Sequence, residues 1–546
     1  MKRLLSVICI PLAALAVAAQ QVAPPPPQGF RISGTVVDAV NNAPLPRTRV
    51  VIAPVSARSA TRAFMTTEDG RFVFDNLVRG KYSLEGERRG YAVQGFNQHE
   101  DYSTAIAVGP GLASENLIFR LQPDASISGK VTDEQNEPVS GEAQVLLFET
   151  AVVNGKLGTR IREQVATDDL GSFRFPRLRP GKYFVAVFAR PWYAPYAART
   201  QTVLSSTPPG QPSPDQETRS PLDVAYPATY YPGVTDSAGA TPIVLHAGDR
   251  FVADLSLQAV PAVRLRYRAS DNDPSQRIFI RLAQRFFEDT ETTARWQSEV
   301  GRGDLHEITG LAPGHYVVHI RRGQMSDQSD LVREVDLTAD ADLDVDSPVS
   351  RASVSGTIKP AEGLGQGRPP QVLFRNIRSG EVRAATVSAS GEFQEQLAPG
   401  TYDVAAVSNA PGLVIQRLTA SGAKVAGRRL VVGTEAVQLT VTMSRGLGRV
   451  EGTVSREGKP VAGAMVLLAP QVDPENNVPL FRRDQSDSDG TFTLADVLPG
   501  SYTVIAIENG WDLEWSKMAV LKKYLAGGKA VEVEENGKHT VEVTLQ

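Results

Sequence analysis

The chain has 546 residues, of which 41% are hydrophobic, with 46 glycines, 37 prolines and a formal net charge of −4. At roughly 100–150 residues per domain, this length predicts about four or five domains. The composition is that of a turn-rich globular protein and excludes a collagenous or disordered chain. The absence of a basic patch argues against nucleic acid as a partner.

The first residues have the pattern of an export signal. Lys2 and Arg3 precede an apolar run that extends from Leu4 to Ala19 and ends in small residues. This pattern predicts a cleaved signal peptide at residues 1–19 and a periplasmic, cell-surface or extracellular location. No later segment is apolar enough for a span of about 20 residues, so we expect no membrane span in the mature chain. An uncleaved anchor is the alternative.

The only cysteine, Cys9, lies inside this signal. The mature chain is therefore expected to contain no disulfide, no thiolate metal site and no thiol nucleophile. Residues 20–29 include the run APPPPQ and predict a proline-rich linker.

One motif recurs five times along the rest of the chain. Its aromatic and aliphatic residues alternate with polar ones on both sides of a turn, which Pro-Gly supplies in four of the copies. This pattern is typical of a β-hairpin. The copies read TEDGRFVFDNLVRGKYSL from Thr67, TDDLGSFRFPRLRPGKYFV from Thr167, GDLHEITGLAPGHYVV from Gly303, SASGEFQEQLAPGTYDV from Ser388 and DSDGTFTLADVLPGSYTV from Asp487.

Each copy follows a short start strand and precedes a closing strand. Four of the five start strands contain a glycine, which predicts a bulge or a close backbone approach. The start strands read ISGTV from Ile32, ISGKV from Ile127, VRLRY from Val263, VSGTI from Val354 and VEGTV from Val450.

This repetition predicts an all-β fold, a tandem array of about five antiparallel Ig-like or prealbumin-like β-sandwich domains. The second domain carries a long aromatic and proline-rich insert at residues 190–246. Because little chain is left for linkers, we expect an elongated row of domains with limited bending. The expected domains are 30–122, 123–260, 261–347, 348–446 and 447–546.

The G-x-V start, the P-V-x-G turn and the D-G-x-F-x-F hairpin resemble those of carboxypeptidase regulatory-like domains, which belong with the transthyretin-like, Cna-B-like and starch-binding-like sandwiches. The resemblance is strongest in the first, second and fifth units and weakest in the third, where His306 replaces the first phenylalanine of the hairpin. It implies a β-sandwich fold and an exported bacterial protein. It does not imply peptidase activity, because the family is named after an accessory domain that stands beside a catalytic one.

The sequence carries no recognisable catalytic motif. None of its six histidines lies in an H-E-x-x-H pattern, and no nucleophile elbow or P-loop is present. His315 and His319 fall in an expected strand, where four residues span about 13 Å. That separation is too large for one metal ion. We therefore expect that the chain is not an enzyme.

The carboxylates that precede the hairpin glycines have two interpretations. Asp69, Asp168, Asp487 and Asp489 could supply oxygen ligands to calcium. Aspartate before glycine is also typical of a hairpin turn, and no glutamate lies where an EF-hand loop requires one. The turn is the favoured interpretation and calcium the minority one, and no other cofactor is expected.

Aromatic residues in two loops are the candidate ligand-binding residues. Their rings could stack on sugar faces, or they could instead staple long loops onto the sandwiches. They are Trp192, Tyr193, Tyr196, Tyr230 and Tyr231 in the insert, and Trp511 and Trp515 in the last unit.

Three functions therefore stay open at this point. The protein could bind a polysaccharide or a cell-surface or extracellular protein, which predicts exposed aromatic rings. It could be a structural spacer or stalk, which predicts buried rings. It could also be an accessory subunit of a separate peptidase or glycan-active enzyme, which predicts a large apolar patch on one unit.

Overall fold

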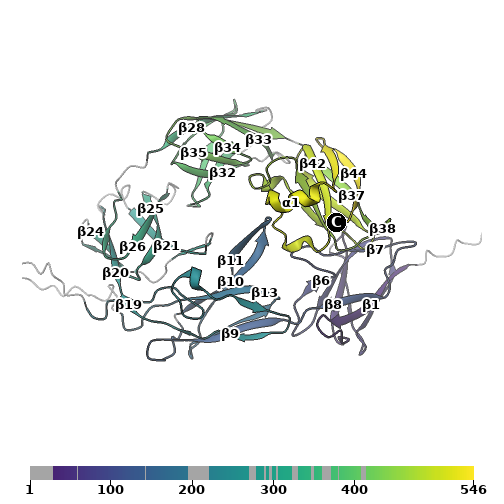
Figure 1. The fold of residues 1–546 in the computed structure, drawn as a ribbon, viewed down its shortest axis with the longest axis horizontal. Coiled ribbons are helices and arrows are strands. Elements are labelled where there is room, and N and C mark those ends of the chain that lie inside the picture. The colour runs from purple at the N-terminus through teal and green to yellow at the C-terminus, as the bar shows by residue number, and fades with distance from the viewer. Residues whose placement is uncertain are drawn as a thin grey trace, which may run out of the picture.

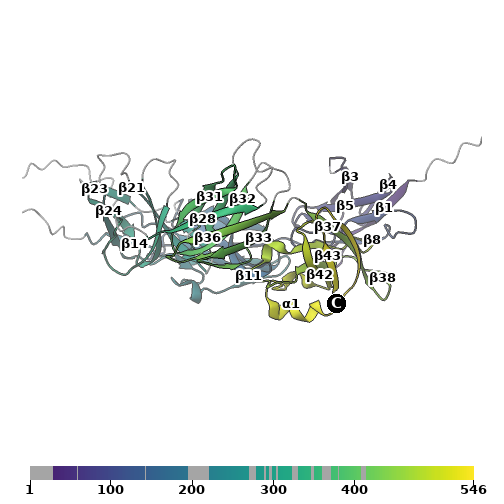
Figure 2. The same cartoon turned by 90° about the horizontal axis from the view of Figure 1, so that it is seen from above.

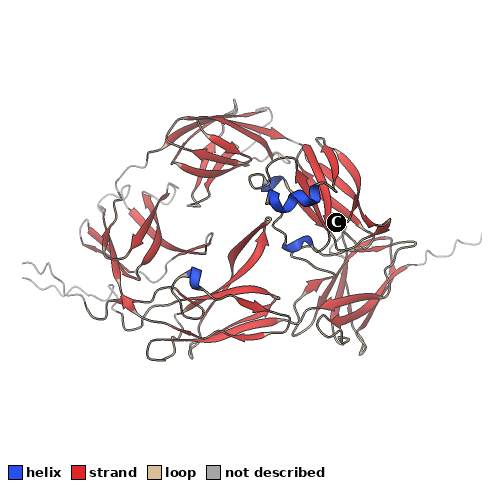
Figure 3. Cartoon of the chain, in the orientation of Figure 1, coloured by secondary structure: helices blue, strands red, loops and turns tan. Residues whose placement is uncertain are grey.

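The structure is a computed structural model that describes residues 29–57, 59–141, 143–194, 220–269, 278–287, 290–293, 298–302, 305–322, 330–345, 350–359, 370–378, 380–407, 414–444 and 446–546. The described chain is built almost wholly of strands and contains one α-helix, α1 (Met518–Leu525) (Figure 3). Its sheets pair into five sandwiches, called domains 1 to 5 in chain order, which confirms the all-β prediction. No helix of the described part is both long and apolar enough to cross a membrane. The predicted signal peptide and most of the proline-rich linker lie outside the described residues.

Domain 1 packs the sheet β4-β1-β8 against the sheet β3-β2-β5-β6, in which β7 also pairs with β5. Its strands are β1 (Phe30–Asp38), β2 (Arg49–Pro54), β3 (Arg62–Met65), β4 (Arg71–Leu77), β5 (Gly80–Glu87), β6 (Gln94–Gly95), β7 (Ile106–Val108) and β8 (Leu117–Leu121).

Domain 2 has the same plan with a longer hairpin, β10–β11, and with the insert between β13 and β16. Its elements are β9 (Ala125–Thr132), β10 (Gln144–Val153), β11 (Lys156–Ala166), β12 (Ser172–Leu178), β13 (Gly181–Phe188), β14 (Val224–Ala225), β15 (Thr229–Tyr230), η2 (Ser237–Gly239), β16 (Ile243–Leu245), β17 (Arg250–Val252) and β18 (Leu255–Ser256).

Domains 3 and 4 are sandwiches of two sheets each. A short strand, β19 (Val260–Pro261), leads into domain 3 and pairs with β14. The strands of domain 3 are β20 (Val263–Arg268), β21 (Ile278–Phe286), β22 (Thr290–Thr293), β23 (Ser298–Arg302), β24 (Leu305–Leu311), β25 (Gly314–Arg322), β26 (Asp330–Leu337) and β27 (Ala341–Asp342). Those of domain 4 are β28 (Ala352–Lys359), β29 (Gln371–Asn376), β30 (Val382–Thr386), β31 (Glu392–Leu397), β32 (Gly400–Val407), β33 (Val414–Ser421), β34 (Lys424–Ala426), β35 (Arg429–Val432) and β36 (Val437–Ser444).

Domain 5 packs the sheet of β37, β38, β41 and β44 against the sheet β40-β39-β42-β43. A loop that includes α1 covers the outer face of the second sheet and forms an additional apolar cluster there. The elements of this domain are β37 (Gly448–Arg456), β38 (Lys459–Pro460), β39 (Met465–Pro470), η3 (Val478–Leu480), β40 (Arg482–Gln485), β41 (Thr491–Val497), β42 (Gly500–Ile507), η4 (Gly510–Asp512), α1, β43 (Lys529–Val533) and β44 (Lys538–Thr544).

The start strand of every domain pairs antiparallel with the first strand of the repeated hairpin and parallel with the closing segment. In the four domains whose start strand contains a glycine, that glycine lies where these backbones approach closely. A Cβ atom added at Gly452 would lie 2.0 Å from the Val541 carbonyl oxygen, and one at Gly129 would lie 2.2 Å from that of Ala253. The predicted close approach is confirmed, and only glycine fits there.

The structure explains why a tyrosine recurs in the hairpin motif. In four domains its ring is buried in the core, and its hydroxyl donates a hydrogen bond to the carbonyl four residues earlier in the chain. A buried tyrosine therefore has a partner for its one polar atom. These tyrosines are Tyr82, Tyr183, Tyr316 and Tyr402.

The five domains lie in a ring and not in a row (Figure 1). Seen from above, the ring is shallow, with the domains close to one layer (Figure 2). Domain 5 returns to domain 1, where Lys81 contacts Asp487 and Arg483 contacts Glu100. The expectation of an elongated row is therefore wrong, because contacts between the first and last domains close the chain on itself.

Neighbouring domains also contact one another directly. Phe286 of domain 3 enters an apolar cluster on the outer face of domain 2. Arg378 of domain 4 makes two hydrogen bonds of 2.9 and 2.8 Å to Glu334 of domain 3. Ser444 of domain 4 donates a 2.9 Å hydrogen bond to Glu535 of domain 5. These contacts fix the curvature that brings domain 5 back to domain 1.

Candidate functional site

The two tryptophans of the last unit are buried where domain 5 meets other domains, Trp511 against domain 1 and Trp515 beside the hairpin tip of domain 2. Trp511 is 6% and Trp515 is 4% exposed. The imidazole of His99 stacks on Trp511 with ring centroids 5.1 Å apart and an interplanar angle of 4°. Tyr102 lies 5.4 Å from the same ring, so Trp511 is covered by two side chains of domain 1.

The aromatic residues of the insert divide into packed and exposed rings. Tyr230 is buried and lies 6.1 Å from Phe286, so it belongs to the contact between domains 2 and 3. Tyr231 packs edge-on against Phe251 at 5.7 Å within domain 2. Tyr196 lies outside the described residues.

The exposed ring is Trp192, of which 72% is accessible to solvent. It packs edge-on against Tyr193, with centroids 5.8 Å apart. Tyr193 and Tyr226 both donate hydrogen bonds to the Glu134 carboxylate. Burial and this carboxylate raise the pKa of Tyr193 to about 12, so its hydroxyl stays protonated at neutral pH.

Three of the four predicted carboxylates accept hydrogen bonds within their own turns. Asp69 accepts from Thr67 at 2.6 Å, and Asp168 accepts from the backbone N–H of Ser172 at 2.7 Å. Asp489 accepts from the Thr491 hydroxyl at 2.6 Å. No group of three or more His, Cys, Asp or Glu side chains arranged for a metal ion occurs among the described residues. Calcium binding at these carboxylates stays a prediction.

Asp487 reaches beyond its own domain. Its Oδ2 atom accepts from the Lys81 ammonium at 2.5 Å, and its Oδ1 atom accepts from the Ala105 backbone N–H at 2.9 Å. The neighbouring Ser488 N–H donates to the Ala105 carbonyl at 3.0 Å. The turn that the sequence placed in a domain core is thus also a contact of domain 5 with domain 1.

A second group of contacts lies beside this turn. Arg483 binds both carboxylate oxygens of Glu100, at 3.1 and 2.8 Å. The guanidinium carbon of Arg483 also lies 5.4 Å from the ring centre of Tyr102. The amide group of Gln485, which is 2% exposed, donates to the Asn97 carbonyl and to the Thr104 hydroxyl, each at 2.8 Å. A buried amide with these partners specifies one docking geometry, because displacing either domain leaves it unsatisfied.

Asp484 lies next to this contact and titrates unusually. Burial raises its pKa to about 6, even though the Thr493 and Gln485 backbone N–H groups donate to it. Burial likewise raises the pKa of Asp487, while Lys81 lowers it. The junction therefore holds two acidic groups in surroundings that disfavour their charge.

Domain 2 reaches the same face of domain 5 through the tip of its long hairpin. The hairpin crosses the inside of the ring toward the loop that includes α1 (Figure 1). Ser516 donates to the Gly155 carbonyl at 2.7 Å, and the Leu157 N–H donates to Glu514 at 3.1 Å. A Cβ atom at Gly155 would lie 2.5 Å from the Trp515 ring. Only glycine lets this tip reach the tryptophan.

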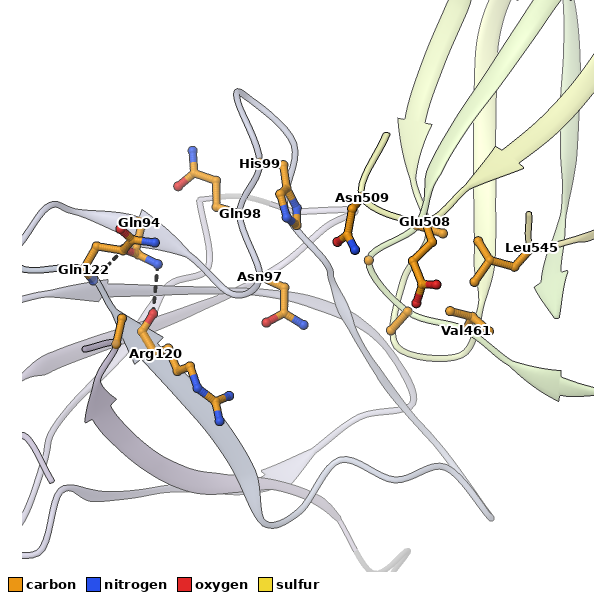
Figure 4. Close-up of a pocket in the computed structure, with 14 residues that line it drawn as sticks. Gln94, Asn97, Gln98, His99, Arg120, Gln122, Val461, Glu508, Asn509 and Leu545 are labelled. Atoms are coloured by element: carbon orange, nitrogen blue, oxygen red, sulfur yellow. Dashed lines mark hydrogen bonds between the residues drawn. The ribbon is translucent and has the colours of Figure 1, made fainter. Parts of the chain in front are cut away.

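A cavity of about 410 Å³ opens where domains 1 and 5 meet. Polar side chains line it from both domains, with His99 and Asn509 facing one another across the boundary (Figure 4). Apolar side chains of domain 5, including Val461 and Leu545, form part of its wall. The polar lining residues are Gln94, Asn97, Gln98, His99, Arg120, Gln122, Glu508 and Asn509.

Several of these polar groups have no partner within the described protein. The side chains of Asn97, Arg120, Gln122 and Asn509 make no hydrogen bond to the part of the chain that the structure describes. Gln94, in contrast, is engaged with the backbone of Arg120 and Gln122. The cavity thus offers free donors and acceptors, whereas its glutamate, Glu508, is already paired with Arg456.

The sequence singled out Asp487, Trp511 and Trp515 as candidates, but it did not indicate the charged residues that join domains 1 and 5. Lys81, Glu100 and Arg483 are ordinary surface charges in an isolated domain, and no spacing connects them. The signal that could have been used is at Gly155, because Asn-Gly between two alternating runs predicts a tight hairpin. The length of those runs indicates a hairpin that projects beyond its sandwich.

The carboxypeptidase regulatory-like domain family matches the chain at residues 31–122 and 126–211. No curated protein sequence matches the chain. Among solved structures, the Bacillus anthracis TIE protein is 11% identical with a TM-score of 0.16, over 95% of this chain and 74% of its own. The full-length major pilin RrgB from Streptococcus pneumoniae is 8% identical with a TM-score of 0.18, over 94% and 99%. At these TM-scores the likeness carries no argument about function or assembly.

Proposed function

We propose that this chain, a tandem β-sandwich protein whose first two domains are carboxypeptidase regulatory-like domains, is an exported, non-catalytic binding protein. Its ligand is a saccharide, held in the cavity between domains 1 and 5. The observation that carries this proposal is the set of unbonded side chains, Asn97, Arg120, Gln122 and Asn509, that line a cavity shared by the two domains.

The chemistry of the lining favours a saccharide. A carboxamide offers both a donor and an acceptor, which matches a hydroxyl group that is itself donor and acceptor. Glu508 is paired with Arg456, so among the described residues Arg120 is the unpaired charge of the lining and can donate hydrogen bonds to sugar hydroxyl groups. Val461 and Leu545 supply apolar surface for the C–H face of a sugar ring.

Two further observations support a non-catalytic, exported protein. The sequence lacks catalytic motifs, and the family of the first two domains is named after an accessory domain. The basic and apolar start of the chain has the pattern of an export signal. A periplasmic, cell-surface or extracellular location follows from that signal.

The proposal is tested by thermal melts of the full chain with a panel of neutral and acidic oligosaccharides. A ligand that binds only the folded state raises the melting temperature. We expect one or more of them to raise it, and we expect Gln122→Ala and Asn509→Asp to abolish the shift. Gln438→Ala, which removes an exposed glutamine from domain 4, is the matched control and should keep the shift. A panel with no shift in the parent protein, or a shift that survives both cavity variants, would overturn the proposal.

A second candidate site is the exposed aromatic pair Trp192 and Tyr193. Its support is the 72% exposure of the Trp192 ring beside a tyrosine fixed by Glu134, which suits stacking on a sugar face. A glycan shift that is lost in Trp192→Ala but kept in Gln122→Ala would assign binding to this pair. Leu170→Ala, another exposed apolar residue of domain 2, is the control.

The alternatives of a spacer and of an accessory subunit make different predictions. A spacer works through the distance that it spans, and a closed ring spans much less distance than a row of the same five domains. An accessory subunit would bind its enzyme through protein surface, and the melt would then show no glycan shift. Calcium and chelator arms of the same experiment test Asp69, Asp168, Asp487 and Asp489 as metal ligands.

A further inference from the structure

The face of domain 5 that meets the other domains is a docking platform, defined here by Arg483, Gln485, Asp487, Trp511 and Trp515. It is occupied by a loop of domain 1 and by the hairpin tip of domain 2. The hydrogen bonds that connect it to domain 1 span 381 to 410 residues of sequence.

Uncovering the platform costs free energy, because it exposes aromatic rings to water. Trp511 and Trp515 are buried in the junction, and opening the ring would expose the rings that His99, Tyr102 and Gly155 now cover. An exposed patch of this kind on a folded protein is a site of association.

The junctions of the ring differ in the kind of contact that holds them. An apolar cluster crosses the contact between domains 2 and 3, and another includes Tyr102 of domain 1 with the platform. Among the described residues, the apolar cluster of domain 4 contains residues of that domain alone. Its described contacts to both neighbours include the hydrogen bonds of Arg378 and Ser444. We therefore expect the ring to open at the junctions of domain 4.

We infer that the platform of one copy binds domains 1 and 2 of a second copy, so that two open rings close on each other. The second copy carries the same loop and the same hairpin tip, so every charge pair and hydrogen bond of the closed ring is available in trans. Exchange between two copies is reciprocal and gives two identical contacts related by a two-fold axis. The cavity described above would then be lined by residues of both chains.

The experiment uses two full-length chains, each with Cys9→Ser and one new cysteine. One carries Ala105→Cys and the other Ser488→Cys, two positions joined by a backbone hydrogen bond across the junction. The chains are mixed at rising concentration, oxidised and separated without reductant. We expect a disulfide-linked dimer of the two different chains that exceeds a Leu170→Cys plus Ser488→Cys control mixture by at least about tenfold, and that grows with concentration.

A chain with both Ala105→Cys and Ser488→Cys provides the internal reference. At low concentration it should form a crosslink within one chain, which reports the closed ring itself. Adding Glu100→Gln to the Ala105→Cys chain removes the charge partner of Arg483 and should lower the yield of mixed dimer. If the double variant crosslinks within one chain while the mixture gives no more dimer than the control, exchange is excluded. If neither crosslinks, the contact on which the inference rests is itself absent.

Discussion

The ammonium group of Lys81 lies 2.5 Å from the Asp487 carboxylate and 2.5 Å from the Thr491 hydroxyl, so a lysine of the first domain is bound by the hairpin turn of the last. Asp489 lies 3.9 Å from the same ammonium. A turn that looked like a cation site thus holds a cation, which the protein supplies from its own chain. The link joins residues more than 400 positions apart and helps to close the ring.

Replacing Lys81 by alanine should weaken ring closure. Asp487 would keep one backbone donor but lose its charge partner in surroundings that already disfavour its ionised form. Because both side chains keep some exposure, we expect a loss of about 1 kcal/mol in the free energy of closure. Small-angle scattering should show a larger radius of gyration. Lys459→Ala, at an exposed lysine of the same charge, should leave the radius unchanged, and equal radii for the two variants would contradict the prediction.

Asp484 should make stability depend on pH in an unusual direction. Its pKa is 3.8 ordinarily and about 6 in the folded protein, so the folded state binds the proton more tightly. The contribution of this residue to the free energy of unfolding is therefore greatest below about pH 4 and is lost as the pH rises to about 6. Between pH 4 and pH 7, the free energy of unfolding of the parent protein should fall by about 2 kcal/mol more than that of Asp484→Asn. Denaturant titrations of both proteins at the two pH values measure this difference. Asp403→Asn, an exposed aspartate of domain 4, should reproduce the parent profile.

Gly155→Ala should detach the hairpin tip of domain 2 from domain 5. The new Cβ atom would lie 2.5 Å from the Trp515 ring, and the residue has a φ of +75°. Gly111→Ala is the matched control, because its φ is +77° and nothing lies within 4 Å of its added Cβ. Both variants carry the same backbone strain of about 1 kcal/mol. Only Gly155→Ala should change tryptophan fluorescence, and an equal change in both would argue against docking at this tip.

Gly452→Ala should destabilise domain 5 through its core. The added methyl would lie 2.0 Å from the Val541 carbonyl oxygen, so the start and closing strands must separate. We expect a loss of about 2–4 kcal/mol, as for an overpacked core, measured by chemical denaturation. Gly158→Ala lies in a strand with nothing within 4 Å and should change stability by less than about 1 kcal/mol. Similar losses in the two variants would show that strand glycines matter here for chain flexibility alone.

The fold of each domain was readable from the sequence because its signals are local. Alternation around Pro-Gly, the start-strand glycine and the buried tyrosine all lie within one hairpin or one pair of strands. The ring was not readable, because its contacts join Lys81, Glu100 and Asn97 to residues hundreds of positions away, and none of them departs from an ordinary surface pattern. The aromatic residues of the loops could be selected from the sequence as Trp and Tyr residues outside the repeated strands. The sequence could not show that Trp511 and Tyr230 would face other domains.

The first and last strands of each sandwich pair in parallel, and this pairing sets the order in which the domains can complete their folding during synthesis. The middle strand of the sheet is made first, but its partner arrives only with the closing segment, for domain 5 with β44. Because the ribosome releases the amino terminus first, each domain can complete its folding only after its own last residues have been made. The ring can close only after those of domain 5 have been made. A premature stop before Lys538 would therefore leave a chain with four finished sandwiches, an unpaired sheet edge in the fifth, and no closure.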